Sequence, residues 1–261
     1  MKTIRLAAAA FVALSAAALA QSEGVAEFRG SMGVGRGPSL TSSGKVYFTK
    51  SAYRLEWEVN LSALAERKWN VPEGVLPKRS RMVIIQKQSD LDLNIHLNDD
   101  RRTYVMTDVK QLREEAARLP HPTTYTVEKL GNDTVAGVPC LQALVKSSRG
   151  TTVEMCVATG LTAASSWIEA MNRRDSSDNL FKALREKGLV GFPVRLVTRS
   201  RSKSEPSLTI ELVRFDKKAL PPSLFEIPAG YTPASEYLNL TPEQEQMLRE
   251  SRQKKGPQRV R

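Results

Sequence analysis

Tyr53-Arg-Leu-Glu-Trp-Glu-Val59 is the stretch that decides the fold class of this chain. Its first, third, fifth and seventh residues are apolar, and the three residues between them are charged. Successive side chains of an extended chain point to opposite faces, so this alternation predicts a half-buried β-strand. We expect it to pair in a hairpin with residues 46–50.

Strand-like segments recur on both sides of this stretch. Residues 25–34 open the series, and the segment 35–44, rich in Gly, Pro and Ser, is expected to be a loop. The remaining expected strands are 82–88, 91–97, 102–106, 125–130, 141–145, 151–157, 194–200 and 208–215. Residues 61–76 are apolar for a loop, and two interpretations stay open: a flap over an apolar site or a cap on the core.

A few helices are expected between the strands. Residues 108–119 begin with a capping box, and a charged helix starts at Thr241. Two further helices are expected between these two segments, because each carries an apolar stripe on one side at helical spacing. The first stripe consists of Ala164, Trp167, Ile168 and Met171, and the second of Leu180, Phe181 and Leu184. The second stripe is expected to be capped by Ser176 or Ser177 and to end at Gly188. Core packing is the favoured role of both stripes, ahead of a lid over a ligand.

These elements together predict an α+β, mainly β fold. Ten or eleven strands and a few helices indicate one curved antiparallel sheet packed against helices. Strand 91–97 also raises the question of a metal site, because its polar face carries Asp90, Asp92, Asn94 and His96. The solvated face of an antiparallel sheet explains this pattern more simply. We therefore expect these four side chains to face solvent and to bind no metal.

The two ends of the chain differ from the rest. Residues 1–20 have a basic start, an apolar run and the triplet Ala18-Leu19-Ala20, which predict a secretory signal peptide. No cysteine follows the expected cut, so a lipid anchor is not expected. The protein is predicted to be exported, soluble, and periplasmic or secreted. The expected division is signal peptide (1–20), one curved-sheet domain (21–232), and a C-terminal helix with a basic tail (233–261).

The last thirteen residues carry +5 of the formal net charge of +11. Residues 249–261 contain six Lys and Arg residues against one Glu. A solubilising tail is the favoured interpretation, and attraction to an anionic membrane surface or an acidic partner is the functional alternative. Nucleic acid is not expected as a partner, because the protein is exported and shows no nucleic-acid recognition signature.

Cys140 and Cys156 are the only cysteines. An even pair in an exported protein predicts a disulfide. The segments 141–145 and 151–157 are strand-like, and 147–150 is a turn cluster. A hairpin folded about Ser148 would place the two cysteines opposite each other on one face, within bonding reach.

No catalytic motif stands out in the sequence. Gly33-Val-Gly-Arg-Gly37 joins two expected strands, whereas a nucleotide-binding loop must open a helix. The chain has no Gly-x-Ser-x-Gly and no His-Glu-x-x-His motif, and it has only two histidines. We therefore predict a non-enzymatic protein without cofactor or metal, although carboxylate pairs that converge only in space stay open.

Three stretches resemble a known group of proteins. They are Tyr125-Thr-Val-Glu-Lys-Leu-Gly-Asn-Asp-Thr-Val-Ala-Gly-Val-Pro-Cys140, Val153-Glu-Met-Cys156-Val and Pro221-Pro-Ser-Leu-Phe-Glu-Ile-Pro-Ala-Gly-Tyr231. With the order of expected strands and helices, they resemble a bacterial exported family of unknown function. That family is similar to the periplasmic lipoprotein carriers of the LolA/LolB type. The disulfide hairpin and the basic tail depart from the carriers, and no position here matches a cargo-contacting arginine of theirs.

The resemblance implies an unclosed antiparallel β-barrel with helices on its concave face and an apolar cavity between them. It also implies a carrier or binder of lipid, acylated protein or another apolar ligand. The residues expected to line the cavity are Trp57, Leu93, Ile95, Trp167, Ile168, Met171, Phe181 and Leu184. The alternative is an envelope protein-interaction or stress-sensing module with a filled core and no ligand. The oligomeric state is not predicted.

Overall fold

The computed structural model describes residues 23–33, 39–62, 78–108, 110–111, 114, 123–161, 177–200, 206–234 and 246. It contains helix α5 (Ser177–Glu186), the 3-10 helix η2 (Pro222–Phe225) and the strands β1 (Gly24–Gly33), β2 (Ser39–Phe48), β3 (Ala52–Asn60), β4 (Arg79–Lys87), β5 (Asp90–Asn98), β6 (Thr103–Asp108), β7 (Tyr125–Val135), β8 (Val138–Ser147), β9 (Thr152–Ala158), β10 (Phe192–Arg199), β11 (Leu208–Lys217) and β12 (Thr232–Pro233). Several predicted segments lie outside the described residues. They are the signal peptide, most of the helix 108–119, most of the loop 61–76, the apolar stripe that contains Trp167, and the basic tail.

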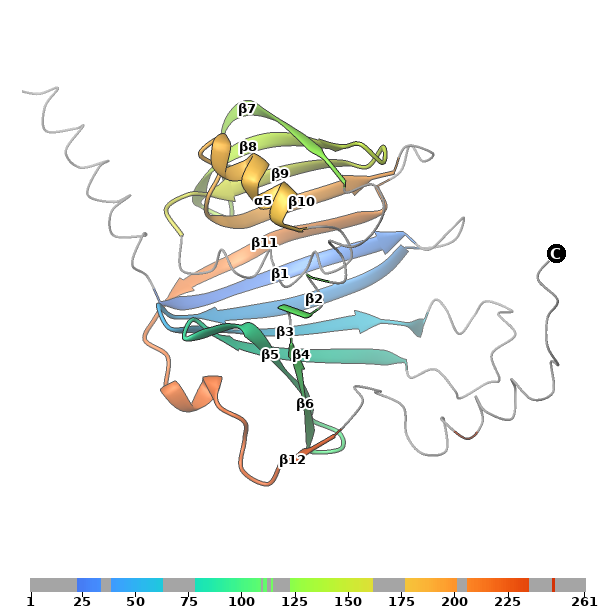
Figure 1. Cartoon of the computed structure of the whole chain (residues 1–261), viewed down its shortest axis with the longest axis vertical. Helices are drawn as coiled ribbons and strands as arrows, with labels where there is room; N and C mark the ends of the chain where they lie inside the picture. The colour runs from blue at the N-terminus through green and yellow to red at the C-terminus, as the bar shows by residue number, and fades with distance from the viewer. Residues whose placement is uncertain are drawn as a thin grey trace, which may run out of the picture.

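All twelve strands belong to one sheet, in the order β12-β6-β5-β4-β3-β2-β1-β11-β10-β9-β8-β7. Neighbouring strands pair antiparallel, apart from β12, which runs parallel to β6. Strands β7 and β12 stand at opposite ends of this order, so the described sheet is unclosed (Figure 1). The predicted mainly β, unclosed antiparallel architecture is confirmed.

One face of this sheet, called the inner face below, carries the main apolar core. Direct pairing places four buried side chains in a row across β1 to β4, namely Ala26, Val46, Leu55 and Ile84. Paired residues of antiparallel strands share a face, so this row defines the inner face from one strand to the next. The row continues to His96 on β5.

Helix α5 packs on the inner face toward the β7 end of the sheet. Alternation along β1 puts Gly30 on the inner face, and Gly30 pairs with Ile210. Ile210 pairs with Leu196, which pairs with Met155. Met155 shares an apolar cluster with Leu184 of α5, which lies over β8–β10 in Figure 1. The predicted helix of the second apolar stripe is thus confirmed, beginning at a predicted cap residue.

The opposite face of β3–β6 is covered by the segment 220–231. Phe225 of η2 forms a second apolar cluster with Ala52, Val83, Ile85, Ile95 and Leu97. The Tyr231 hydroxyl donates a hydrogen bond of 2.7 Å to Asp99 Oδ1, and Arg54 Nη1 donates one of 3.3 Å to the Leu224 carbonyl. Burial, assisted by the Asp99 carboxylate, raises the pKa of Tyr231. Apolar packing and hydrogen bonds therefore both attach this segment to the sheet.

The polar face of β5 was predicted incorrectly in part. Asp90 and Asp92 are exposed, as expected, but Asn94 and His96 are buried. His96 pairs with Ile84 and so belongs to the inner face, which is itself withdrawn from solvent at this position. The alternation identified which side chains share a face. It could not show that both faces of β5 are covered.

Strand β2 begins at Ser39, inside the segment 35–44 that was predicted to be a loop. Its serines and glycine have weak strand propensity, but β2 pairs with β1 from Ser39 and with β3 from Ser42. Pairing with β1 along the whole strand, and with β3 from Ser42, supplies partners for the backbone and overrides the local preference.

The predicted disulfide between Cys140 and Cys156 is present, with Cα atoms 5.5 Å apart. Its register differs from the prediction, because Cys156 pairs with Gln142 rather than with Cys140. The bridge is therefore diagonal across β8 and β9. The turn lies one residue later than predicted and contains Gly150, whose φ of 83° is in the left-handed region that favours glycine.

Candidate functional site

Trp57 of β3 lies across two glycines of the neighbouring strands. A Cβ atom built on Gly44, its partner on β2, would lie 2.1 Å from the indole Cε3 atom. A Cβ atom on Gly30 of β1 would lie 3.2 Å from Cζ2. The absence of both Cβ atoms lets the indole approach the inner face closely. Trp57 packs against the main core but stays half-buried, so part of its apolar surface is accessible.

The residues predicted to line an apolar cavity are distributed over several clusters in the described part of the chain. Trp57 and Phe181 both contact the main core. Ile95 packs under η2 on the opposite face, and Leu93 shares that face and is half-buried. Leu184 packs between α5 and β8–β9. Three further residues lie outside the described residues: Trp167, Ile168 and Met171.

A buried group of polar side chains lies beside the apolar part of the inner face. This inner polar cluster consists of five residues of β3–β5: Tyr53, Gln86, Asn94, His96 and Asn98. The pairing of Tyr53 with Gln86, and of Ile84 with His96, places the cluster on the inner face. Asn94 has 0% exposure, and neither its Nδ2 nor its Oδ1 atom has a hydrogen-bond partner in the part of the chain that the structure describes. The sequence prediction missed this cluster because it assigned Asn94 and His96 to solvent.

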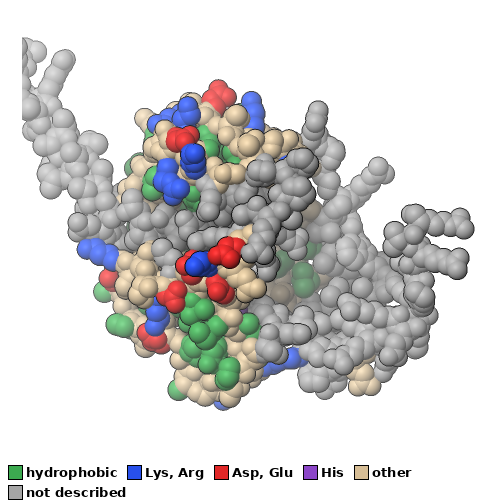
Figure 2. All heavy atoms as spheres, in the orientation of Figure 1, with side chains coloured by type: hydrophobic (Ala, Val, Ile, Leu, Met, Phe, Trp, Pro, Cys, Tyr) green, Lys and Arg blue, Asp and Glu red, His purple; other side chains and the backbone are tan. Residues whose placement is uncertain are grey.

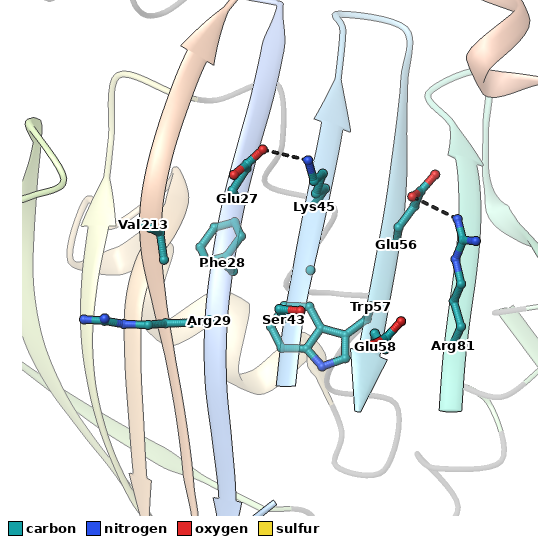
Figure 3. Close-up of a pocket in the computed structure, with 11 residues that line it drawn as sticks. Glu27, Phe28, Arg29, Ser43, Lys45, Glu56, Trp57, Glu58, Arg81 and Val213 are labelled. Carbon is teal, nitrogen blue, oxygen red and sulfur yellow. Dashed lines mark hydrogen bonds and ion pairs between the residues drawn. The ribbon is translucent and has the colours of Figure 1, made fainter. Parts of the chain in front are cut away.

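A shallow groove of about 520 Å³ crosses β1–β4. Its charged lining residues are Glu27, Arg29, Lys45, Glu56, Glu58 and Arg81 (Figure 3). Lys45 Nζ lies 2.8 Å from Glu27 Oε1, and this hydrogen bond raises the pKa of Lys45. The Arg81 guanidinium lies 3.2 Å from Glu56 Oε2.

The other two charged residues of the groove are paired as well. Arg29 lies 3.0 Å from Glu211, and Glu58 lies 3.2 Å from Arg79. Figure 2 accordingly shows charged side chains of both signs next to one another on the described surface. The groove presents no surplus charge to a singly charged ligand, and its exposed pairs each contribute about 0–1 kcal/mol to stability.

Asp133 of β7 lines a second hollow, of about 470 Å³, beside Cys140. Its carboxylate accepts hydrogen bonds from the Thr134 main-chain N–H at 2.7 Å, from Arg195 Nη2 at 2.6 Å and from Gln142 Nε2 at 2.8 Å. The Thr134 hydrogen bond, followed by the Arg195 one, lowers the pKa of Asp133. These bonds join β7, β8 and β10 and leave the carboxylate poorly suited to acid–base catalysis at neutral pH.

Asp133→Asn is expected to lower the free energy of unfolding at neutral pH and to change its pH dependence. A carboxyl group whose pKa is lowered in the folded state stabilises the folded protein at pH values above its ordinary pKa of 3.8. This stabilisation is lost as the pH falls through the folded-state pKa. The difference between wild type and variant should therefore be largest above pH 4 and shrink in acid. Urea unfolding from pH 7 to pH 2.5 measures it, with the exposed Asp90→Asn as control. A difference that is constant with pH would contradict the assignment.

The described residues meet neither the requirements of a metal site nor those of a membrane-spanning helix. Among the described residues, no three His, Cys, Asp or Glu side chains come together in a way that could hold a metal ion. None of the described helices is long and apolar enough to cross a membrane.

The chain is similar to several solved structures at low sequence identity. An uncharacterised conserved protein from Thermus thermophilus is 10% identical, with 87% of this chain and 98% of that chain covered and a TM-score of 0.45. The MucA/MucB complex of Pseudomonas aeruginosa is matched at 12% identity, over 84% of this chain and 60% of that chain, with a TM-score of 0.39. A LolA superfamily protein from Nitrosomonas europaea is 11% identical, over 82% and 97%, with a TM-score of 0.34. At these TM-scores the likenesses say nothing of function.

The comparison with protein families identifies the family of the chain. No curated protein matches the chain. The model of a domain of unknown function, DUF4412, matches residues 28–231, which span β1 to the closing segment. This range contains all three stretches that suggested an uncharacterised family. The chain therefore belongs to the DUF4412 family.

Proposed function

We propose that the protein is a non-enzymatic binder or carrier of lipid, acylated protein or another apolar ligand in the bacterial envelope. The observation that carries this proposal is the half-buried Trp57 on the inner face of an unclosed sheet. Each CH2 group of an acyl chain buried against such a surface contributes about 0.8 kcal/mol. The predicted signal peptide supports the envelope location.

The arrangement around Trp57 supports ligand contact in preference to simple core filling. The indole lies against Gly30 and Gly44, so its approach to the sheet depends on two positions without side chains. A flat aromatic surface beside an apolar core is suited to an extended acyl chain. Phe181 of α5 contacts the same core cluster and is the second predicted residue that stays in the proposal.

Native mass spectrometry of the protein purified from its own envelope without detergent tests this proposal, with lipid extraction beside it. A bound species of lipid mass is the expected result. Trp57→Ala should weaken binding of a fluorescent fatty acid about tenfold, which corresponds to about 1.4 kcal/mol. Met106→Ala is the matched control, because Met106 is exposed and pairs with Ile95 on the opposite face. A clean apo mass without fatty-acid uptake would contradict the proposal.

A protein-interaction module is the second candidate function. It is favoured by the two hollows described above, which are open to the surface and have both polar and apolar side chains in their lining. Cross-linking in the intact envelope, followed by identification of the linked protein, tests this candidate. A specific partner that is captured equally by wild type and Trp57→Ala would favour it over the lipid binder.

A further inference from the structure

We propose that the inner polar cluster binds the uncharged, hydrogen-bonding head group of an amphiphilic ligand whose acyl chain lies against Trp57. This inference rests on the proposed function and names the class of ligand. The head groups that fit are hydroxyl, ester or amide groups joined to an acyl chain, as in a monoacylglycerol.

Asn94 is the residue on which this inference depends. Its amide is fully buried, and both polar atoms lack a hydrogen-bond partner within the described ranges. A buried polar group without a partner carries a desolvation cost, and native proteins contain few such groups. A leucine of similar size would avoid this cost in a core. A ligand that offers a donor and an acceptor would satisfy both atoms.

The chemistry of the cluster selects an uncharged head group. Its five side chains are three amides, one phenol and one imidazole, and none of them is a Lys, Arg, Asp or Glu. A charged head group buried here would lose its hydration without gaining a fixed opposite charge. The acid nearest in sequence on this face of β5 is Asp92, which is exposed. Amides donate and accept, as hydroxyl and ester groups require.

The position of the cluster fits a ligand with one polar and one apolar end. From β1 to β3 the central row of the inner face is apolar, with Ala26, Val46 and Leu55. On β5 the inner face becomes polar, with Asn94 and His96. The register places Met82 and then Asn98 in the row of Trp57, so Asn94 lies two strands away and four residues further along β5. With about 4.8 Å between strands and about 3.4 Å per residue, Asn94 is roughly 17 Å from Trp57 along the inner face. A single acyl chain with its head group can span that distance.

Binding of two neutral probes to the full chain tests the inference: monolauroylglycerol, which has a head group, and the apolar dye N-phenyl-1-naphthylamine. Asn94→Leu is expected to raise the Kd for monolauroylglycerol about tenfold and to leave the Kd for the dye within twofold. Asn132→Leu, at an exposed position of β7, is the matched control and should change neither. Asn94→Ala should reproduce the selective loss if the leucine variant does not fold.

The outcomes separate this inference from the proposed function. Wild type that binds neither probe would overturn both. Two results would overturn the head-group site alone. In the first, wild type binds the dye but not monolauroylglycerol. In the second, the Asn94→Leu variant keeps both affinities, which would mean that water rather than a ligand satisfies the Asn94 amide. A variant with a lower Tm and equal loss of both probes would assign Asn94 a structural role and would overturn it as well. The expected Tm of ligand-free Asn94→Leu is equal to or above that of wild type.

Discussion

Phe192→Ala is expected to lower the free energy of unfolding by about 3–5 kcal/mol, the range for removal of a fully buried aromatic side chain. Phe192 of β10 has 0% exposure. Its ring centroid lies 5.6 Å from that of Phe28 on β1 and 5.7 Å from that of Phe48 on β2. Phe48 also stacks on Phe215 of β11. The substitution would therefore leave a cavity among side chains from four strands.

Urea or guanidinium unfolding followed by circular dichroism measures this effect. Leu130→Ala is the matched control, because Leu130 is 52% exposed on β7 and its truncation should change stability by no more than about 0.5 kcal/mol. Phe192→Leu keeps most of the volume and should cost less than Phe192→Ala, so the series remains measurable if the alanine variant does not fold. A loss below about 1 kcal/mol for Phe192→Ala would mean that the aromatic cluster collapses around the gap.

Local periodicity predicted the elements of the fold well. The alternation from Tyr53 to Val59 identified β3, and the stripe of Leu180, Phe181 and Leu184 identified α5. These signals lie within single segments, where one buried face imposes a period of 2.0 or 3.6. The start of β2 was missed because its strand conformation comes from pairing with β1, and from Ser42 onward also with β3, rather than from its own residues.

The candidate site was less predictable, because it depends on which faces become covered. Trp57 and Ile95 both looked like cavity residues, but the register places them on opposite faces of the sheet. The alternation of the sequence correctly predicted that Asn94 and His96 lie on the same face of the strand, but it did not predict that this face is buried. Covering a sheet face is a long-range event, since Phe225 packs on residues more than a hundred positions earlier in the chain.

Removal of the disulfide is the second large effect that we expect. Replacing both Cys140 and Cys156 by alanine should lower the free energy of unfolding by about 3 kcal/mol in the chain-entropy model, for a sequence separation of 16 residues. The bridge joins β8 and β9 next to β7, which stands at the end of the sheet. Its loss should therefore loosen the β7–β9 end more than the core around Val46.

Non-reducing mass spectrometry should first show the wild-type chain two hydrogens lighter than its reduced form. Unfolding measured with and without a reducing agent then separates the contribution of the disulfide bond to stability from the contribution of packing by the two cysteine side chains. The reductant should destabilise wild type by nearly the same amount as the double substitution and should leave the double variant unchanged. Hydrogen exchange should rise mainly in β7–β9, because a bridge across neighbouring strands restricts local opening as well as the unfolded chain. Uniform destabilisation of all strands would show that the bridge acts only through the unfolded state.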